Sequence, residues 1–153
     1  MRDFGIYKRL RDIREDKDMT QSDIAEVLNV DKSTYSKWET ETEVMPLRRV
    51  VAFANFTKKS LDYITGLSDD SSNIEYVINI DKKAIGKRLK DTRIKLEYTQ
   101  EDLANLLGSC QSCISDYETG NKLILSSYAF EICRLYNISF DWLVCGIEKN
   151  KKF

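Results

Sequence analysis

Apolar residues recur along the chain at the three- and four-residue spacing of helices that are buried on one side. Near the start, Ile6, Leu10 and Ile13 form one such stripe, and further stripes follow at the same spacing. Residues suited to helix N-caps precede several stripes, with Thr20 and Asp31 as clear examples. The pattern therefore predicts an all-α protein built from short helices.

The sequence also repeats itself. When it is shifted by 79 residues, residues 6–64 align without a gap with residues 85–143, and 17 of the 59 pairs are identical. A chance match does not keep one register for so long, so the chain consists of two copies of a unit of about 65 residues. In the second unit we expect helices at about 82–95, 100–107, 111–119, 126–136 and 140–145.

The repeat predicts two five-helix domains, at residues 1–67 and 82–153, with a linker at residues 68–81. The linker begins with polar loop residues and continues with an alternating apolar series that runs from Ile74 to Ile80. This alternation fits a short strand that pairs with a second chain. It also fits an extended linker whose apolar residues rest on a neighbouring domain, and we favour this second interpretation.

The second and third expected helices of each unit are separated by a turn of three or four residues, which is helix-turn-helix spacing. Both units resemble the XRE family, which contains Cro and lambda-repressor-like proteins. The resembling segments are Lys8-Arg9-Leu10 to Ala25, Tyr35 to Glu39 and Ser60 to Gly66, with their counterparts Ile85 to Ala104, Ile114 to Glu118 and Ser139 to Leu143. The resemblance implies tandem lambda-repressor-like helix-turn-helix domains in a transcriptional regulator that binds double-stranded operator DNA. It also implies a possible homodimer.

In this family the third helix lies in the major groove, so its outward positions are the expected base contacts. These candidate DNA-binding residues are Lys32, Ser33, Thr34, Ser36 and Lys37 in the first unit, and Gln111, Ser112 and Ser115 in the second. Gln21 and Gln100 match a family residue that binds a phosphate and braces the recognition helix, as the third helix is called. The alternative for all of them is an ordinary solvated helix face.

Two ion pairs are implied by the same resemblance. Arg14 with Glu39, and Arg93 with Glu118, match residues that join the first and third helices in the family. We interpret both pairs as structural, because a partly buried pair is costly to break from one side.

The two units differ at positions that face DNA. Asp116 stands where the first unit has Lys37, and an acid near phosphates is repulsive. Glu41 stands where the second unit has Gly120, although the family favours glycine as a left-handed helix cap there. Because its recognition helix is basic, we expect the first unit to bind DNA more strongly.

Cys110 and Cys113 form a Cys-x-x-Cys sequence at the expected start of a helix. This spacing lowers a thiol pKa and recurs in redox proteins, so a redox function is conceivable. Zinc fits less well, because the chain contains no His. Cys133 aligns with Ala54, which places it in a core.

Composition limits the function further. The 153 residues have a net charge of −1 and include no His, which removes most acid–base and nucleophilic catalysis, so we expect no enzyme, catalytic residue, metal or cofactor. We also expect no membrane contact, reduced cysteines and a cytoplasmic location, because no secretion signal or long apolar run is evident.

The net charge bears on the partner as well. Residues 1–73 carry 12 Lys and Arg against 14 Asp and Glu, which gives −2, whereas residues 74–153 carry 12 against 11, which gives +1. Neither half is basic, so we expect weak non-specific DNA affinity and a strong dependence on base contacts. The alternative function is a protein-interaction module or an antitoxin whose DNA face has decayed.

Overall fold

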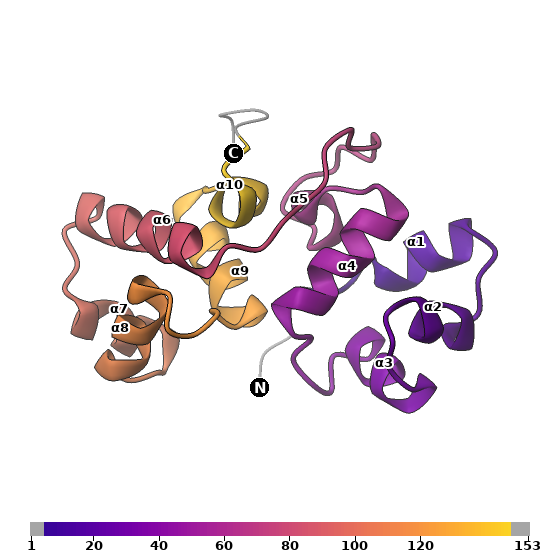
Figure 1. Ribbon diagram of the computed structural model, residues 1–153, viewed down its shortest axis with the longest axis horizontal. Helices are drawn as coiled ribbons and strands as arrows, with labels where there is room; N and C mark the ends of the chain where they lie inside the picture. Colours follow the sequence, from indigo (N-terminus) through magenta and orange to yellow (C-terminus); the bar gives the residue numbers. More distant parts are fainter. Residues whose placement is uncertain (1–4, 148–153) are drawn as a thin grey trace.

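The computed structural model describes residues 5–147, and this part of the chain folds into ten α-helices without a β-strand (Figure 1). The first domain contains α1 (Leu10–Asp16), α2 (Gln21–Val27), α3 (Lys32–Glu39), α4 (Leu47–Thr57) and α5 (Leu61–Ile64). The second contains α6 (Lys82–Lys95), α7 (Gln100–Leu107), α8 (Gln111–Thr119), α9 (Ser126–Tyr136) and α10 (Phe140–Cys145). The all-α, tandem fold predicted from the sequence is confirmed. The outer ends of the two expected domains, residues 1–4 and 148–153, lie outside the described residues.

Side-chain caps fix where the helices of the helix-turn-helix begin. Thr20 and Asp23 form a reciprocal capping box at α2, and Thr99 and Asp102 form the same box at α7. The hydrogen bonds of each box satisfy backbone N–H groups that have no partner inside the helix. The side chain of Asp31 accepts a hydrogen bond from the backbone N–H of Thr34 and so caps α3.

The first helices of the two domains differ in length. A Cβ added at Gly86 in α6 would lie 2.3 Å from the carbonyl oxygen of Tyr117, so glycine allows α6 to pack closely against α8. The aligned residue in the first domain is Tyr7, and α1 begins only at Leu10, whereas the sequence pattern predicts a helix from about Ile6. The buried Tyr7 ring therefore lies in the turn before the helix, which shortens α1.

The linker is extended and rests on the first domain instead of forming a strand. Ile74 and Ile78 are buried, while Val77 between them is exposed. The side chain of Asn55 on α4 accepts a hydrogen bond from the backbone N–H of Ile78 at 2.8 Å and donates one to its carbonyl at 2.9 Å. Because Asn55 occupies both backbone groups of Ile78, they do not pair with a neighbouring strand there.

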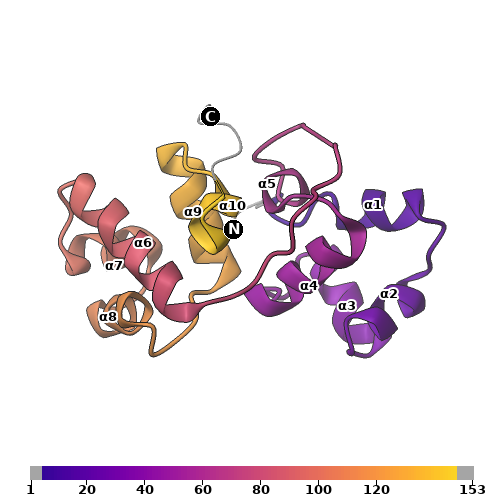
Figure 2. The same cartoon turned by 45° about the horizontal axis from the view of Figure 1, so that its top comes forward.

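The two domains contact each other through matching residues of α5 and α10, which lie side by side in Figures 1 and 2. The carboxylate of Asp141 accepts hydrogen bonds from the backbone N–H groups of Leu61 and Asp62, both at 2.9 Å. In return, the carboxylate of Asp62 accepts one from the backbone N–H of Phe140 at 2.6 Å. Since Asp62 and Asp141 are aligned in the repeat, the interface has approximate two-fold symmetry.

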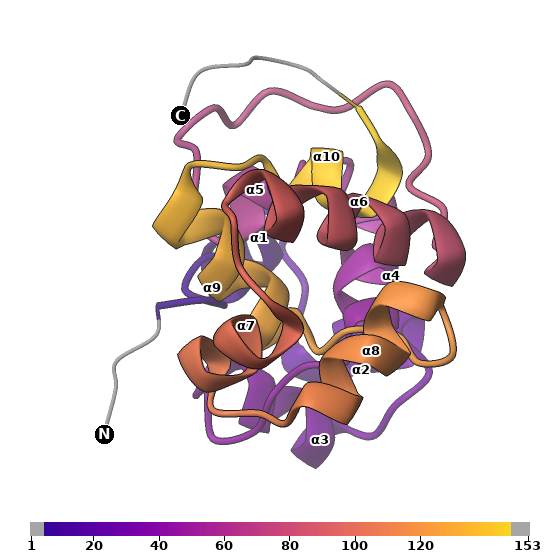
Figure 3. The same cartoon turned by 90° about the vertical axis from the view of Figure 1, so that its left-hand side faces the viewer.

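A second contact connects the domains away from this symmetric pair. The hydroxyl of Ser126, at the start of α9, donates to the carbonyl of Met45 at 2.5 Å and lies 2.6 Å from the hydroxyl of Tyr7. All three residues are buried, and one cluster of buried apolar side chains includes residues of both domains. The domains therefore form one packed body, in which α3 and α8 lie toward the same side, at the bottom in Figures 1 and 3.

Candidate nucleic-acid interface

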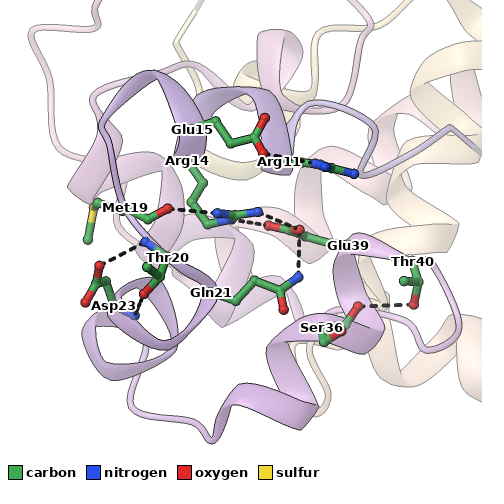
Figure 4. A network of polar contacts seen from close by, with 10 residues as sticks. All are labelled: Arg11, Arg14, Glu15, Met19, Thr20, Gln21, Asp23, Ser36, Glu39 and Thr40. Carbon is green, nitrogen blue, oxygen red and sulfur yellow. Dashed lines mark hydrogen bonds and ion pairs between the residues drawn. The ribbon is translucent and has the colours of Figure 1, made fainter.

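A polar network fixes the angle between the helices of the first helix-turn-helix (Figure 4). The guanidinium of Arg14 on α1 donates to the carboxylate of Glu39 on α3, at 2.7 Å from Nε and 3.3 Å from Nη2. The side-chain amide of Gln21, the first residue of α2, donates to the same carboxylate at 3.0 Å. Arg14 also donates to the carbonyl of Met19 in the turn between α1 and α2. Three helices thus meet at the Glu39 carboxylate.

The second domain contains the same network at the aligned residues. Arg93 donates to Glu118 at 2.5 Å from Nε and 3.1 Å from Nη2, and Gln100 donates to Glu118 at 3.0 Å. The arginine also donates to the carbonyl of Tyr98, which is aligned with Met19. In each domain the structure therefore brings the expected arginine–glutamate pair together with the glutamine expected to brace the recognition helix.

Both ion pairs are shielded from water. The side chains of Arg14 and Glu39 are 10% and 6% exposed, and those of Arg93 and Glu118 are 11% and 2% exposed. Burial by itself would raise the pKa of Glu39, but its hydrogen bonds, with that from Arg14 the largest, and the positive charge of Arg14 outweigh burial and hold this pKa below its ordinary value. The hydrogen bond to Glu118 raises the pKa of Arg93. The Arg14–Glu39 pair is therefore charged at neutral pH.

The recognition helix of the first domain is α3, and it presents a basic outer face. Lys32, Ser33 and Lys37 are exposed, while Thr34 and Ser36 are half-buried. On the opposite side of the helix, Tyr35 and Trp38 are buried and pack edge to face, with ring centroids 6.2 Å apart. The buried aromatic pair holds α3 on the domain and leaves its expected base-contacting residues toward solvent.

The recognition helix of the second domain is α8, and its outer face is neutral and polar. Gln111 and Ser112 are exposed, and Ser115 is half-buried. The side-chain amide of Gln111 donates to the Oε1 atom of Gln100 at 2.5 Å. This bond extends the network of Gln100 and Glu118 to the outer face of α8, so Gln111 is held in one orientation.

Each recognition helix carries one further ion pair at this face, which was not predicted from the sequence. In the first domain Lys37 lies 3.5 Å from Glu43, and in the second the aligned Asp116 lies 3.6 Å from Lys122. The two pairs have the same geometry with opposite signs. The charge of Asp116 is thus balanced locally by Lys122, as that of Lys37 is by Glu43. The signal was present in the sequence, because both aligned positions reverse their charge.

Glu41 and Gly120 occupy the same left-handed position after the recognition helices. Glu41 has a φ of 59°, and Gly120 has a φ of 82°. The carboxylate of Glu41 accepts a hydrogen bond from the backbone N–H of Ile6 at 3.2 Å, which ties it to the first domain. The left-handed turn is therefore present in the first domain without the glycine that the family favours, with the backbone strain of a residue that carries a side chain.

Comparison with known proteins agrees with this geometry. A helix-turn-helix family model matches residues 10–64 and 89–143, which is well over half of the chain and includes one copy in each domain. The chain belongs to the XRE-type helix-turn-helix family. As expected for tandem helix-turn-helix domains, the two matched segments are aligned by the internal repeat and each includes a recognition helix with its buried ion pair.

Two curated relatives of this helix-turn-helix protein come from Bacillus subtilis (strain 168). One is an uncharacterized HTH-type transcriptional regulator, YobD, which is 38% identical over 63 residues, covering 41% of this chain and 56% of the relative. The other is the HTH-type transcriptional regulator ImmR, which is 35% identical over 69 residues, covering 45% of this chain and 54% of the relative. This chain spans about half the length of each. The family is thus one of DNA-binding transcriptional regulators and not of enzymes.

Within the described residues, no helix of this helix-turn-helix protein is both long enough and apolar enough to cross a membrane.

Proposed function

We propose that this protein is a transcriptional regulator that recognises a specific DNA sequence by placing α3 and α8 in the major groove. The observation that carries the proposal is the position of both recognition helices on the same side of one packed body (Figures 1 and 3). A single chain then presents two recognition helices to one face of a duplex. This is the arrangement that a dimer of single helix-turn-helix domains uses for two half-sites.

The exposed side chains support different base preferences at the two half-sites. Lys32 and Lys37 carry donors suited to the O6 and N7 atoms of guanine. Gln111 can pair bidentately with adenine, and its bond to Gln100 orders its side chain before binding. Ser33, Thr34, Ser36, Ser112 and Ser115 supply hydroxyls that suit either kind of base edge. We therefore propose an asymmetric operator with two unlike halves.

Gln21 and Gln100 are proposed to contact phosphates next to each half-site. Their amide nitrogens are bonded to Glu39 and Glu118, which holds both side chains beside the recognition helices. Phosphate contacts fix the register of a protein on DNA, whereas base contacts determine its sequence preference. We propose that Arg14 and Arg93 act only through the fold, because their guanidinium groups are committed to Glu39 and Glu118.

In vitro selection of DNA from a random library tests this proposal. We expect the intact protein to enrich one motif with two unlike halves. Lys32→Ala/Lys37→Ala should relax the first half, and Gln111→Ala should relax the second. Arg11→Ala is the control, since Arg11 is exposed on α1, away from α3, and pairs with Glu15 in an i,i+4 contact (Figure 4). Failure to enrich any motif, or equal effects of all variants on both halves, would contradict the proposal.

Sedimentation of the complex on the enriched site tests whether one chain suffices. We expect one chain per site, because each chain already has two recognition helices in a fixed relation. Two chains per site would instead support a homodimer with four such helices.

A further inference from the structure

Two cysteines lie at the start of the second recognition helix. Cys110 is the N-cap residue of α8 and is exposed, while Cys113 is half-buried one turn later. Their sulfur atoms are 2.6 Å apart. This is closer than two unbonded sulfurs normally approach, so the pair is placed to form a disulfide, whose S–S bond is about 2.05 Å long. In the first domain the aligned residues are Asp31 and Thr34, which form an ordinary helix cap.

The surroundings of three cysteines shift their thiol pKa values in opposite directions. The neighbouring Cys113 thiol, followed by the Ser112 hydroxyl, lowers the pKa of Cys110 to about 7. Burial raises the pKa of Cys133 well above its ordinary value and that of Cys145 to about 11. Because the thiolate is the reactive form of cysteine, Cys110 is the thiol most ready to react at neutral pH.

We propose that Cys110 and Cys113 are a reversible thiol–disulfide pair whose oxidation by a peroxide strengthens DNA binding by the second domain. The DNA-binding part of this inference rests on the function proposed above, whereas the oxidation itself does not. Among the described residues no group of three or more metal-ligating side chains is placed to hold an ion, so the pair is not part of a larger metal site.

The chemistry is a two-electron oxidation in two steps. The Cys110 thiolate attacks one oxygen of the peroxide, the O–O bond breaks, and the alkoxide or hydroxide that leaves takes up a proton. This yields a sulfenic acid on Cys110. The Cys113 sulfur then attacks the Cys110 sulfur, loses its proton, and displaces hydroxide, which leaves as water. Two thiols become one disulfide, and the peroxide is reduced to water and an alcohol or a second water. A thiol reductant restores both thiols by exchange.

Two consequences of the disulfide act in the same direction. The residues between the cysteines are Gln111 and Ser112, which are the exposed residues proposed to contact bases. Closing a ring through Cys110 and Cys113 restricts the backbone of both residues to the conformation they already have in α8, so less conformational entropy is lost on binding. Oxidation also removes the thiolate charge from a face that approaches phosphates. We expect affinity for the selected site to rise about fivefold.

The test uses the full chain, first reduced with a thiol reductant and then treated with hydrogen peroxide. Mass spectrometry of digested protein should show the loss of two hydrogens from the peptide that contains Cys110 and Cys113, with full reversal by the reductant. Cys133 and Cys145 serve as internal controls and should stay reduced. DNA titrations on the selected site should give about fivefold tighter binding for the oxidised protein.

The matched control variant is Cys110→Asp/Cys113→Thr, which reproduces the cap that Asp31 and Thr34 form in the first domain. It should remain folded and bind DNA with an affinity that peroxide does not change. A Cys110 that stays reduced, or that is oxidised to a sulfinic acid without a disulfide, would contradict the proposal that Cys110 and Cys113 form a reversible disulfide. A disulfide without any change in affinity would overturn its effect on DNA. Absence of specific binding in both states would count against the proposed function, while the mass measurement still decides the oxidation.

Discussion

At the scale of single residues, the two aligned glutamates determine how each recognition helix sits on its domain. Glu39 accepts hydrogen bonds from Arg14 of α1 and Gln21 of α2, and Glu118 has the aligned partners. The resemblance to the family indicated which residues pair. It did not indicate that Gln111 would join the second network, because that contact depends on the distance between α7 and α8.

Replacement of Glu39 by alanine leaves the Arg14 guanidinium buried without its counterion. We expect Glu39→Ala to lower the free energy of unfolding by about 3 kcal/mol, because breaking a buried pair from one side strands a charge. Denaturant unfolding measures this loss. Glu43→Ala removes half of an exposed pair and should change the value by less than about 0.5 kcal/mol. Equal effects of the two substitutions would contradict a structural role for Glu39.

Gly120 is required by both its backbone angle and its surroundings. A Cβ at this position would lie 2.9 Å from the Cα of Lys83, and the φ of 82° disfavours side chains. We expect Gly120→Ala to lower the free energy of unfolding by about 2–3 kcal/mol. Gly108→Ala is the control, since its φ is 69° but nothing lies within 4 Å of the added Cβ, so it should cost only about 1 kcal/mol. Thermal unfolding measures the stability of both variants. The loss in Gly108→Ala gives the cost of backbone strain, and the additional loss in Gly120→Ala gives the cost of steric overlap.

At the scale of helices, the sequence predicted what is determined locally. The five helices expected in the second unit agree with α6 to α10, because their ends depend on local caps such as the Thr99 box and the left-handed Gly108. The start of α1 was not predictable in this way, because it depends on how closely the first helix packs against the recognition helix. Gly86 allows this close packing in the second domain, whereas the aligned Tyr7 does not allow it in the first. The contact of the linker with Asn55 also joins distant parts of the sequence, so alternation alone left two interpretations open.

The contact between Asn55 and Ile78 should hold the linker on the first domain. We expect Asn55→Ala to increase amide hydrogen exchange at Ile78 by about tenfold, because the buried N–H loses its acceptor and the segment opens more often. Exchange followed by mass spectrometry or NMR measures this. Asn79→Ala is the control, since Asn79 is exposed in the same segment. Unchanged exchange at Ile78 in the Asn55 variant would show that the apolar contacts alone hold the linker.

At the scale of the whole molecule, two buried carboxyl groups lie next to each other at the interface between the domains. Asp62 and Asp141 are 7% and 2% exposed, and each accepts backbone hydrogen bonds from the other domain's helix. Burial, followed by the negative charge of Asp141, raises the pKa of Asp62 to about 7. The repeat aligned these two residues, but no sequence pattern indicated that they meet.

The raised pKa of Asp62 makes stability depend on pH. Below an unfolded-state pKa near 3.8, Asp62 is protonated in both the folded and the unfolded state. Its contribution to the free energy of unfolding is then fully present. Between that pKa and about 7, only the folded state keeps the proton, so the free energy of unfolding falls as the pH rises. We expect a loss of about 2 kcal/mol from pH 5.5 to pH 8.

Denaturant unfolding at the two pH values measures this loss. The measurement is best made in the Cys110→Asp/Cys113→Thr background, because the lowered pKa of Cys110 contributes in the opposite direction in the same window. Asp62→Asn keeps an oxygen for the Phe140 N–H without the charge, so it should remove most of the pH dependence. If the free energy of unfolding still falls with rising pH in this variant, the pH dependence comes from groups other than Asp62.

The reciprocal contact between α5 and α10 has a consequence for how such a regulator works at low abundance. A homodimer dissociates on dilution, and every substitution in it appears on both sides of the interface. Here the polypeptide itself keeps the two halves at a high effective concentration, so in the function proposed above occupancy of the operator would not depend on a prior association of subunits. Each half is also encoded separately. A substitution at Lys32 therefore changes one half alone, which would allow the two half-sites of the proposed operator to diverge independently.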